Sequence, residues 1–263
     1  MDLSHAYEAN FWRISLSSDP QPNGDPGIES LNAQRVAFFA MATLAELRES
    51  DTESHLMRIQ RYVRLLVDKL RTHPAFASTL TPDYVNALFE SLPMYDMGTV
   101  GIPDRILLKP GRLGASEVAI MRTHTTLGHE ALLRAEKTLG LSTPLLNLAK
   151  ELTLCHHEKW NGKGYPKGLA GTQIPVSARI VALADVYDAL ISNKVYKDGI
   201  SHDAAVQVIF GERDAHFDPD VVDAFIEVND EFLAVTQRFA DTDADMQQKI
   251  EYLANAIAEV ASL

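Results

Sequence analysis

The chain has 263 residues and a formal net charge of −12, from 36 acidic and 24 basic side chains. Its 46% hydrophobic content is ordinary for a globular protein and supports one large or two modest domains, which excludes a largely disordered chain. The acidic field disfavours nucleic acid polymers and anionic membranes as partners. With no apolar run of roughly 20 residues and no signal-peptide start, we expect a cytoplasmic location.

The N-terminal quarter of the chain predicts an appendage followed by helices. Residues 19–27 are rich in Pro, Gly and Asp and predict a linker, so that residues 1–27 form a short appendage. Residues 28–49 contain neither Gly nor Pro and favour a long helix. A second helix follows, because apolar residues spaced three and four apart form one stripe: Leu56, Ile59, Val63, Leu66 and Leu70.

The remaining pattern is also helical. Good helix composition or helix-start signals mark residues 82–92, 116–139 and 145–157 and the segment after Pro175, and Ser201 and Asp218 are plausible caps of two more helices. We find no convincing strand pattern, so the chain is predicted to be all-α. Residues 241–263 predict a C-terminal amphipathic helix, which either packs on the domain or forms the seam of a homodimer.

Two adjacent histidines, His156 and His157, precede a Gly-rich loop that ends in Tyr165 and Pro166. Neighbouring side chains on a helix point in different directions. Both imidazoles can therefore contribute to one pocket only if that pocket holds more than one bound group, such as a cluster of metals. This stretch is the chemical centre of the sequence.

Other metal-ligand types are spread along the chain, each with an alternative interpretation. Asp51 and His55 either share a helix face as ligands or are an N-terminal acid and a solvated histidine. Asp96, among apolar residues, is a ligand, a paired carboxylate or an Asx-turn acceptor. His124 alone is typical of a surface or hydrogen-bonded histidine as much as of a ligand. Asp185 indicates a ligand or a buried ion-pair partner.

Taken together, these imidazoles and carboxylates exceed what one tetrahedral zinc uses and indicate two or three divalent metals. No thiolate is required, which suits Fe or Mn, with Zn as the alternative. Sites with two metals serve phosphoester hydrolysis by making hydroxide near neutral pH. The candidate ligands are Asp51, His55, Asp96, His124, His156, His157 and Asp185.

Ordered motifs extend from Asp51 to Phe225. They include Tyr95-Asp96-Met97-Gly98, Gly101-Ile102-Pro103-Asp104, His156-His157-Glu158, Gly162-Lys163-Gly164-Tyr165-Pro166 and His216-Phe217-Asp218-Pro219. In these motifs the chain resembles the HD-GYP family, all-α metal-dependent phosphodiesterases of the HD superfamily that hydrolyse the bacterial second messenger cyclic di-GMP. The resemblance implies an HD-superfamily helical bundle over residues 28–240, with a metal site between its helices.

The resemblance also implies roles for individual residues. Asp96, which is the catalytic candidate, would bridge metals, and His124, His156, His157 and Asp185 would ligate them. His55 and Asp51 would serve a further metal, although Asp51 stands where three-metal members usually have Glu. The substrate-binding candidates are Tyr165, which would border the ligand pocket, and Lys194 and Lys197, which would contact the phosphates.

Two residues depart from the family pattern. The signature His-Asp pair is Tyr95-Asp96 here, and the lysine three positions after that Asp is Thr99. Tyrosine has a reference pKa near 10. Tyr95 therefore either ligates as a phenolate, with its pKa lowered by a metal, or leaves a metal under-coordinated. Thr99 removes an ammonium that would neutralise the scissile phosphate.

Two functions follow as hypotheses. The first is a metal-dependent phosphodiesterase that hydrolyses cyclic di-GMP to pGpG and possibly GMP. The second is a degenerate member that binds metal or cyclic di-GMP without cleaving it, as a sensor or a docking surface for another signalling protein. The first is favoured because most of the metal assembly is present.

Overall fold

The computed structural model describes residues 36–45, 48, 54–109, 111–193, 198–247, 249–251 and 254. Contacts divide the chain into two units, Met1–Ala40 and Met41–Leu263. Of the first unit, only the helical residues 36–40 are described, so the predicted appendage lies outside the described residues. The second unit holds the bundle and the candidate site, and the predicted boundary at residue 240 stays a prediction.

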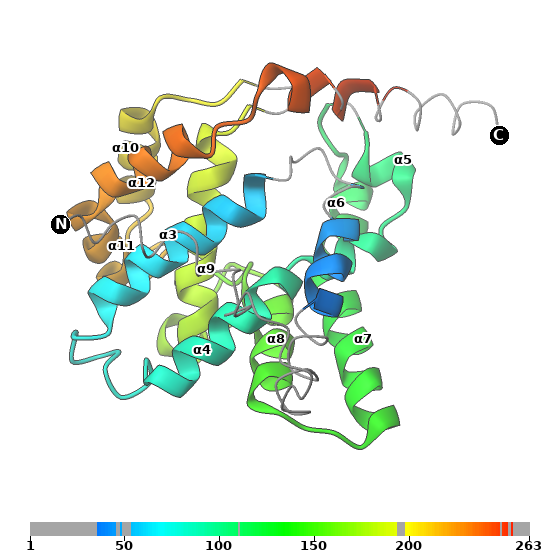
Figure 1. Cartoon of the computed structure of the whole chain (residues 1–263), viewed down its shortest axis with the longest axis horizontal. Coiled ribbons are helices and arrows are strands. Elements are labelled where there is room, and N and C mark those ends of the chain that lie inside the picture. The colour runs from blue at the N-terminus through cyan, green and yellow to red at the C-terminus, as the bar shows by residue number, and fades with distance from the viewer. Residues whose placement is uncertain are drawn as a thin grey trace, which may run out of the picture. The chain divides into compact units, whose positions relative to one another are not determined.

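The described part of the second unit is helical (Figure 1), and its extended pairing amounts to isolated bridges between Asn161 and Ala170 and between Arg213 and Phe217. The predicted all-α class is confirmed. The elements are α3 (Ser54–Leu70), α4 (Pro82–Ser91), η1 (Leu92–Met94), η2 (Met97–Gly101), α5 (Asp104–Leu107), α6 (Ala115–Met121), α7 (His124–Leu139), α8 (Pro144–Cys155), η3 (Gly171–Gln173), α9 (Val176–Ile191), α10 (His202–Gly211), α11 (Pro219–Glu227) and α12 (Asn229–Arg238).

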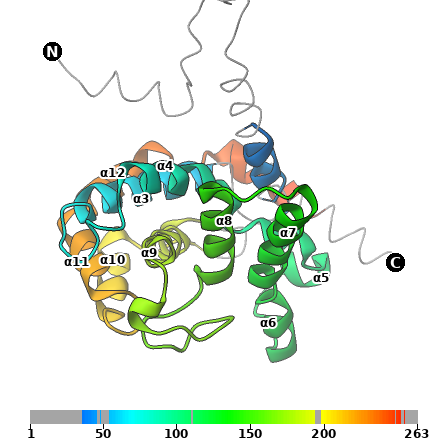
Figure 2. The same ribbon diagram turned by 90° about the horizontal axis from the view of Figure 1, so that it is seen from below.

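Helix α9 is the central element of the bundle, and Figure 2 looks nearly along its axis. It packs against α3, α8, α10 and α11. The predicted apolar stripe of α3 is confirmed, since Ile59, Val63 and Leu66 have no exposed surface. Burying an aliphatic side chain of this kind contributes about 1.5–3 kcal/mol, so the stripe fixes the rotation of α3 about its own axis.

Polar caps and prolines start several helices where the sequence predicts them. The hydroxyls of Thr81, Thr143 and Ser201 and the carboxylate of Asp218 accept backbone N–H bonds at the starts of α4, α8, α10 and α11. Pro82 and Pro144 occupy first-turn positions, where a missing N–H costs nothing. The predicted caps Ser201 and Asp218 are confirmed.

The structure differs from the sequence prediction at two helix ends near the site. Residues 116–139 do not form one helix, because the chain turns at Arg122 and Thr123 and starts α7 at His124. The hydroxyl of Thr123 donates to Ile120 O and closes this turn. Helix α8 ends at Cys155, so the paired histidines follow the helix instead of lying within it.

Close backbone packing holds the η2 segment against α7. A Cβ added to Gly98 would lie 1.9 Å from the carbonyl oxygen of His124, far inside any allowed contact. A Cβ added to Gly128 would lie 3.2 Å from Gly98 N. Glycine at both positions therefore lets Asp96, just before η2, approach His124, at the start of α7.

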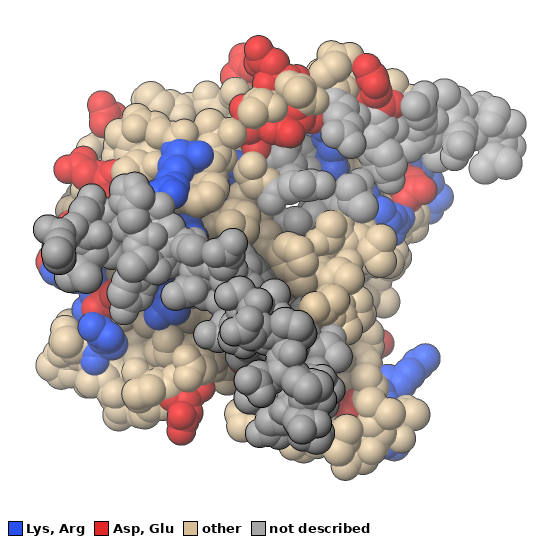
Figure 3. All heavy atoms as spheres, viewed as in Figure 1, with Lys and Arg blue, Asp and Glu red and all other residues tan. Residues whose placement is uncertain are grey.

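No helix among the described residues is long and apolar enough to cross a membrane. On the face shown in Figure 3, acidic side chains gather over the segment that follows α12, and basic side chains stand among uncharged surface. This distribution accords with the net charge of −12. An anionic ligand therefore needs a local source of positive charge.

Candidate metal centre

Four of the predicted ligands converge at one point, and we refer to them as the Asp96 cluster. Asp96, His124, His156 and His157 each offer one ligand atom, and these atoms all lie within 4.8 Å of one another. Asp96 comes from the link between η1 and η2, His124 from the start of α7, and the histidine pair from the residues after α8. The packing of α7 on α8 and on η2 brings the three segments together.

Backbone carbonyls orient two of the imidazoles. His124 Nδ1 lies 2.7 Å from Met121 O, and His156 Nδ1 lies 2.8 Å from Leu152 O. A carbonyl oxygen can only accept, so each Nδ1 carries the proton and donates it. In the neutral ring each Nε2 is then left with a lone pair, which is the form of imidazole that binds a metal.

These lone pairs face one another and a carboxylate oxygen. The two Nε2 atoms are 3.4 Å apart, and they lie 3.2 Å (His124) and 3.4 Å (His156) from Asp96 Oδ1. That oxygen is buried and makes no hydrogen bond with the described residues. Three electron-rich atoms this close repel one another unless a proton or a cation lies between them. The donor set of nitrogen and oxygen fits a divalent metal.

The electrostatics of the cluster favour an anionic Asp96. Burial raises the pKa of Asp96, but His156 and His124 outweigh this and hold it well below its ordinary value. Burial lowers the pKa of His156, yet its contacts with Asp96 leave it raised overall. Burial and the neighbouring His156 hold the pKa of His157 well below its ordinary value, so His157 is neutral and able to ligate at neutral pH.

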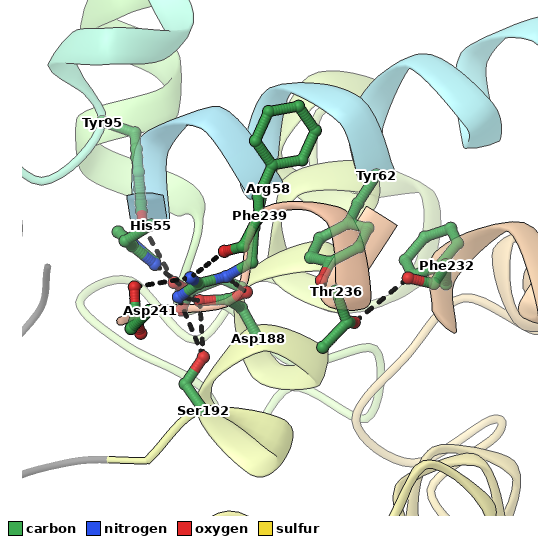
Figure 4. Close-up of polar contacts among 11 residues, drawn as sticks. His55, Arg58, Tyr62, Tyr95, Asp188, Ser192, Phe232, Thr236, Phe239 and Asp241 are labelled. Atoms are coloured by element: carbon green, nitrogen blue, oxygen red, sulfur yellow. Dashed lines mark hydrogen bonds and ion pairs between the residues drawn. The ribbon is translucent and has the colours of Figure 1, made fainter. Parts of the chain in front are cut away.

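A second polar group adjoins this cluster, and we refer to it as the Tyr95 network: Tyr95, His55, Asp185, Asp188 and Arg58. The Tyr95 hydroxyl donates to Asp185 Oδ1 at 2.9 Å and lies 2.8 Å from His55 Nε2. His55 Nδ1 lies 2.8 Å from Asp188 Oδ2. Figure 4 shows His55 between Tyr95 and Asp188. Burial and Asp96 raise the pKa of Asp185.

Arg58 closes the far end of the Tyr95 network (Figure 4). Its guanidinium donates to both Asp188 oxygens, at 2.6 and 2.9 Å, and to the hydroxyl of Ser192 at 2.9 Å. It also donates to Phe239 O and to the Asp241 carboxylate, each at 3.1 Å. Arg58 and Asp188 are 3% and 1% exposed. A buried carboxylate paired in this way keeps its charge, and contacts with His55 and Arg58 hold the pKa of Asp188 low against the effect of burial.

The Gly-rich loop is tied to the histidine pair by Glu158. This carboxylate is 2% exposed and accepts the backbone N–H groups of Lys167 and Leu169, at 2.8 and 2.9 Å. The ring of Tyr165 stacks on His157 with centroids 4.9 Å apart, and the guanidinium of Arg122 lies 4.8 Å from the Tyr165 ring centre. Tyr165 therefore stands at the edge of the Asp96 cluster.

Thr99 is 4% exposed and lies on η2. Its hydroxyl donates to Asp96 O at 2.9 Å and closes the turn that carries the carboxylate. At the position where the family has a lysine, this chain therefore has a short, buried, neutral side chain that hydrogen-bonds its own backbone.

The structure brings most of the predicted ligands together and divides them between two groups. His55 and Asp185 lie in the Tyr95 network instead of the Asp96 cluster. The predictions for Asp51, Lys194 and Lys197 lie outside the described residues. Sequence reasoning missed Asp188, Arg58 and the anchoring role of Glu158. A signal for the first two was available, because each follows a candidate ligand by three residues on the same helix face.

Comparison with known proteins identifies the family. A model described as "HD domain" matches residues 42–221. A probable cyclic di-GMP phosphodiesterase of Vibrio cholerae is 48% identical over 213 residues, covering 81% of this chain and 48% of that protein. A cyclic di-GMP phosphodiesterase of the same organism is 48% identical over 78% of this chain and 42% of that protein.

A third relative, named a 3′3′-cGAMP-specific phosphodiesterase of Vibrio cholerae, is 36% identical over 81% of this chain and 38% of that protein. The chain thus spans less than half the length of these curated relatives. The family match covers the region from α3 to the first residues of α11, which contains both polar groups. The chain belongs to the HD-domain family, in its HD-GYP branch.

Proposed function

We propose that the chain is a metal-dependent phosphodiesterase that hydrolyses cyclic di-GMP to pGpG and GMP. The observation that carries this proposal is the Asp96 cluster, in which two Nε2 lone pairs and an unbonded carboxylate oxygen lie within 3.4 Å of one another. Such an arrangement is costly in a folded protein unless a proton or a cation offsets it. The names of the 48% identical relatives support the reaction and the substrate.

In this proposal the four residues of the Asp96 cluster hold a divalent metal, and His55 and Asp185 supply ligands to a further one. Bound metals of this kind supply a hydroxide nucleophile near neutral pH and stabilise the leaving oxygen. Iron or manganese suits the nitrogen and oxygen donors, with zinc as the alternative. Whether a third metal binds depends on Asp51, which lies outside the described residues.

The surrounding residues would position the substrate. Tyr165 borders the cluster with its ring stacked on His157, so it would form the edge of the pocket that receives cyclic di-GMP. Arg122 adds a positive charge over that ring. Lys194 and Lys197, outside the described residues, remain candidates for phosphate contacts.

A second candidate function is binding of cyclic di-GMP or metal without cleavage, as a sensor or protein-interaction module. It is favoured by the two positions that depart from the HD-GYP pattern, Tyr95 and Thr99. The Thr99 hydroxyl donates to Asp96 O and brings no charge to a phosphate. The Tyr95 hydroxyl, in the place of the usual histidine, is engaged with His55 and Asp185.

A hydrolysis assay separates the two candidates. Chain loaded anaerobically with Fe(II) or Mn(II) should convert cyclic di-GMP to pGpG, and the double variant His156→Ala/His157→Ala should not. His129→Ala is a matched control, because His129 lies outside both polar groups and bonds Lys150 O; it should keep wild-type turnover. Retained binding of cyclic di-GMP with no product would reject the phosphodiesterase in favour of the sensor.

The substrate is tested in the same assay by including 3′3′-cGAMP, because one relative carries that name. Faster turnover of cyclic di-GMP is the expected result.

We also propose three properties of the whole chain: an HD-GYP domain over residues 28–240, a cytoplasmic location, and a homodimer through residues 241–263. Sedimentation of the full chain checks the last of these.

A further inference from the structure

Three donor atoms converge at Tyr95. Its hydroxyl oxygen lies 2.8 Å from His55 Nε2 and 2.9 Å from Asp185 Oδ1. Ligand bonds of about 2 Å around a tetrahedral or octahedral cation place neighbouring donor atoms about 3 Å apart. The two distances from the Tyr95 oxygen are therefore those between neighbouring ligands of one cation.

The imidazole of this set, His55, has the second hydrogen bond that is typical of a metal-ligating histidine. Asp188 Oδ2 lies 2.8 Å from His55 Nδ1, and Arg58 donates hydrogen bonds to both Asp188 oxygens (Figure 4). Ligating histidines usually donate their other ring N–H to a carboxylate, which fixes the ring and makes the free nitrogen more basic. With Nδ1–H directed at Asp188, the lone pair of His55 Nε2 points at the Tyr95 oxygen.

The positive charge at this group comes either from a second proton on His55 or from a cation. The phenol has a single hydrogen, and with His55 neutral it faces two acceptors, His55 Nε2 and Asp185 Oδ1. A cation bound by all three atoms satisfies both acceptors. A cavity of about 20 Å³, enough for one water-sized occupant, lies beside the group and is bordered by His55, Tyr95 and Asp96 but not by Asp185.

We infer that Tyr95 is itself a metal ligand: its oxygen, His55 Nε2 and Asp185 Oδ1 form a tyrosinate-containing cation site beside the Asp96 cluster. On binding, the phenol releases its proton to solvent and the cation takes the place of that proton. Two anionic oxygens and one neutral imidazole carry a charge of about −2, and hard anionic oxygen donors favour a highly charged ion such as Fe(III).

This inference rests on the proposed function, because it names a ligand of the same metal centre. It differs in what it predicts, since a tyrosinate bound to Fe(III) absorbs visible light and a phenol does not. The full chain should be loaded with Fe(II), exposed to air and freed of excess iron. We expect a coloured protein with a tyrosinate signature in its resonance Raman spectrum.

Two variants test the assignment. Tyr95→Phe should lose the visible band and bind one iron fewer per chain than the wild type, while keeping the iron of the Asp96 cluster. Tyr95→His is the matched control, because imidazole is a ligand without a phenolate: it should keep the iron count and lose the band. The iron retained by both variants shows that they are folded.

The possible outcomes are distinguishable. Iron-loaded wild type without the band, or Tyr95→Phe with the wild-type band and iron count, overturns the inference. Turnover of cyclic di-GMP by a chain that lacks the band overturns the inference and leaves the proposed function intact. The band without turnover overturns only the proposed function, and a wild-type chain that binds neither iron, manganese nor zinc overturns both.

Discussion

The Asp96 cluster and the Tyr95 network use similar side chains in opposite ways. In the Asp96 cluster, both oriented imidazoles are backed by neutral carbonyls and their lone pairs face a carboxylate oxygen without a hydrogen bond. In the Tyr95 network, the imidazole is backed by a carboxylate that a buried arginine holds with two bonds. The Asp96 cluster therefore lacks a partner for a buried carboxylate oxygen. In the Tyr95 network, by contrast, the charge of Asp188 is neutralised by Arg58.

This difference separates the residues that would bind metal from those that hold the helices together. Arg58 joins α3 to the end of α9 and to the segment after α12, through Asp188, Ser192 and Phe239. Where Asp96, His124 and His156 converge, Asp96 Oδ1 has no hydrogen-bond partner among the described residues and the two Nε2 atoms face each other at 3.4 Å. Substitutions of Arg58 and Asp188 should therefore act on stability, and substitutions in the Asp96 cluster on metal affinity.

Asp188→Asn should have the largest effect on stability, a loss of about 3–5 kcal/mol, because it leaves the buried Arg58 charge with Asp241 as its one remaining carboxylate among the described residues. Chemical denaturation of the metal-free chain measures this. Asp223→Asn is the matched control: it breaks an exposed pair with Arg213 and should cost at most about 1 kcal/mol. Equal losses in the two variants would contradict the architectural role of Asp188.

His124→Ala should reduce metal affinity by more than about 100-fold, since loss of an outer-shell partner alone costs about 10–100-fold. Titration with Mn(II) followed by calorimetry measures the affinity. His129→Ala, five residues along the same helix α7, should bind with wild-type affinity. If both variants bind equally well, His124 is not a ligand.

Gly98→Ala should destabilise the chain by about 1–3 kcal/mol or more and should weaken metal binding as well, because the new Cβ meets His124 O at 1.9 Å and pushes η2 off α7. Gly211→Ala is the control, since a Cβ there has nothing within 4 Å. It should be neutral or slightly stabilising. Wild-type metal affinity in Gly98→Ala would show that this contact does not position Asp96.

The acid stability of the chain should depend on Asp188. Its folded pKa is lowered, so the stability it contributes is present above its unfolded pKa of about 3.9 and is lost as the pH falls through the lowered value. Each unit of difference in pKa is worth about 1.4 kcal/mol. The gap in unfolding free energy between wild type and Asp188→Asn should therefore narrow from pH 5 downward, and a gap that is constant with pH would refute this account.

The sequence determined the helices, because their signals are local. Apolar spacing predicted α3, and Ser201 and Asp218 predicted the starts of α10 and α11. Ordered motifs also indicated the family and the members of the Asp96 cluster. These predictions succeeded because side-chain periodicity and capping depend on residues a few positions apart.

The tertiary structure decided which ligand types meet. Asp185 was a candidate for the same pocket as His156, yet it bonds Tyr95, and the most deeply buried carboxylate of α9 is Asp188. Residues 55, 95 and 185 come from separate segments. Their 2.8 and 2.9 Å contacts depend on how α3 and α9 pack against each other, which is a long-range property that no local pattern encodes.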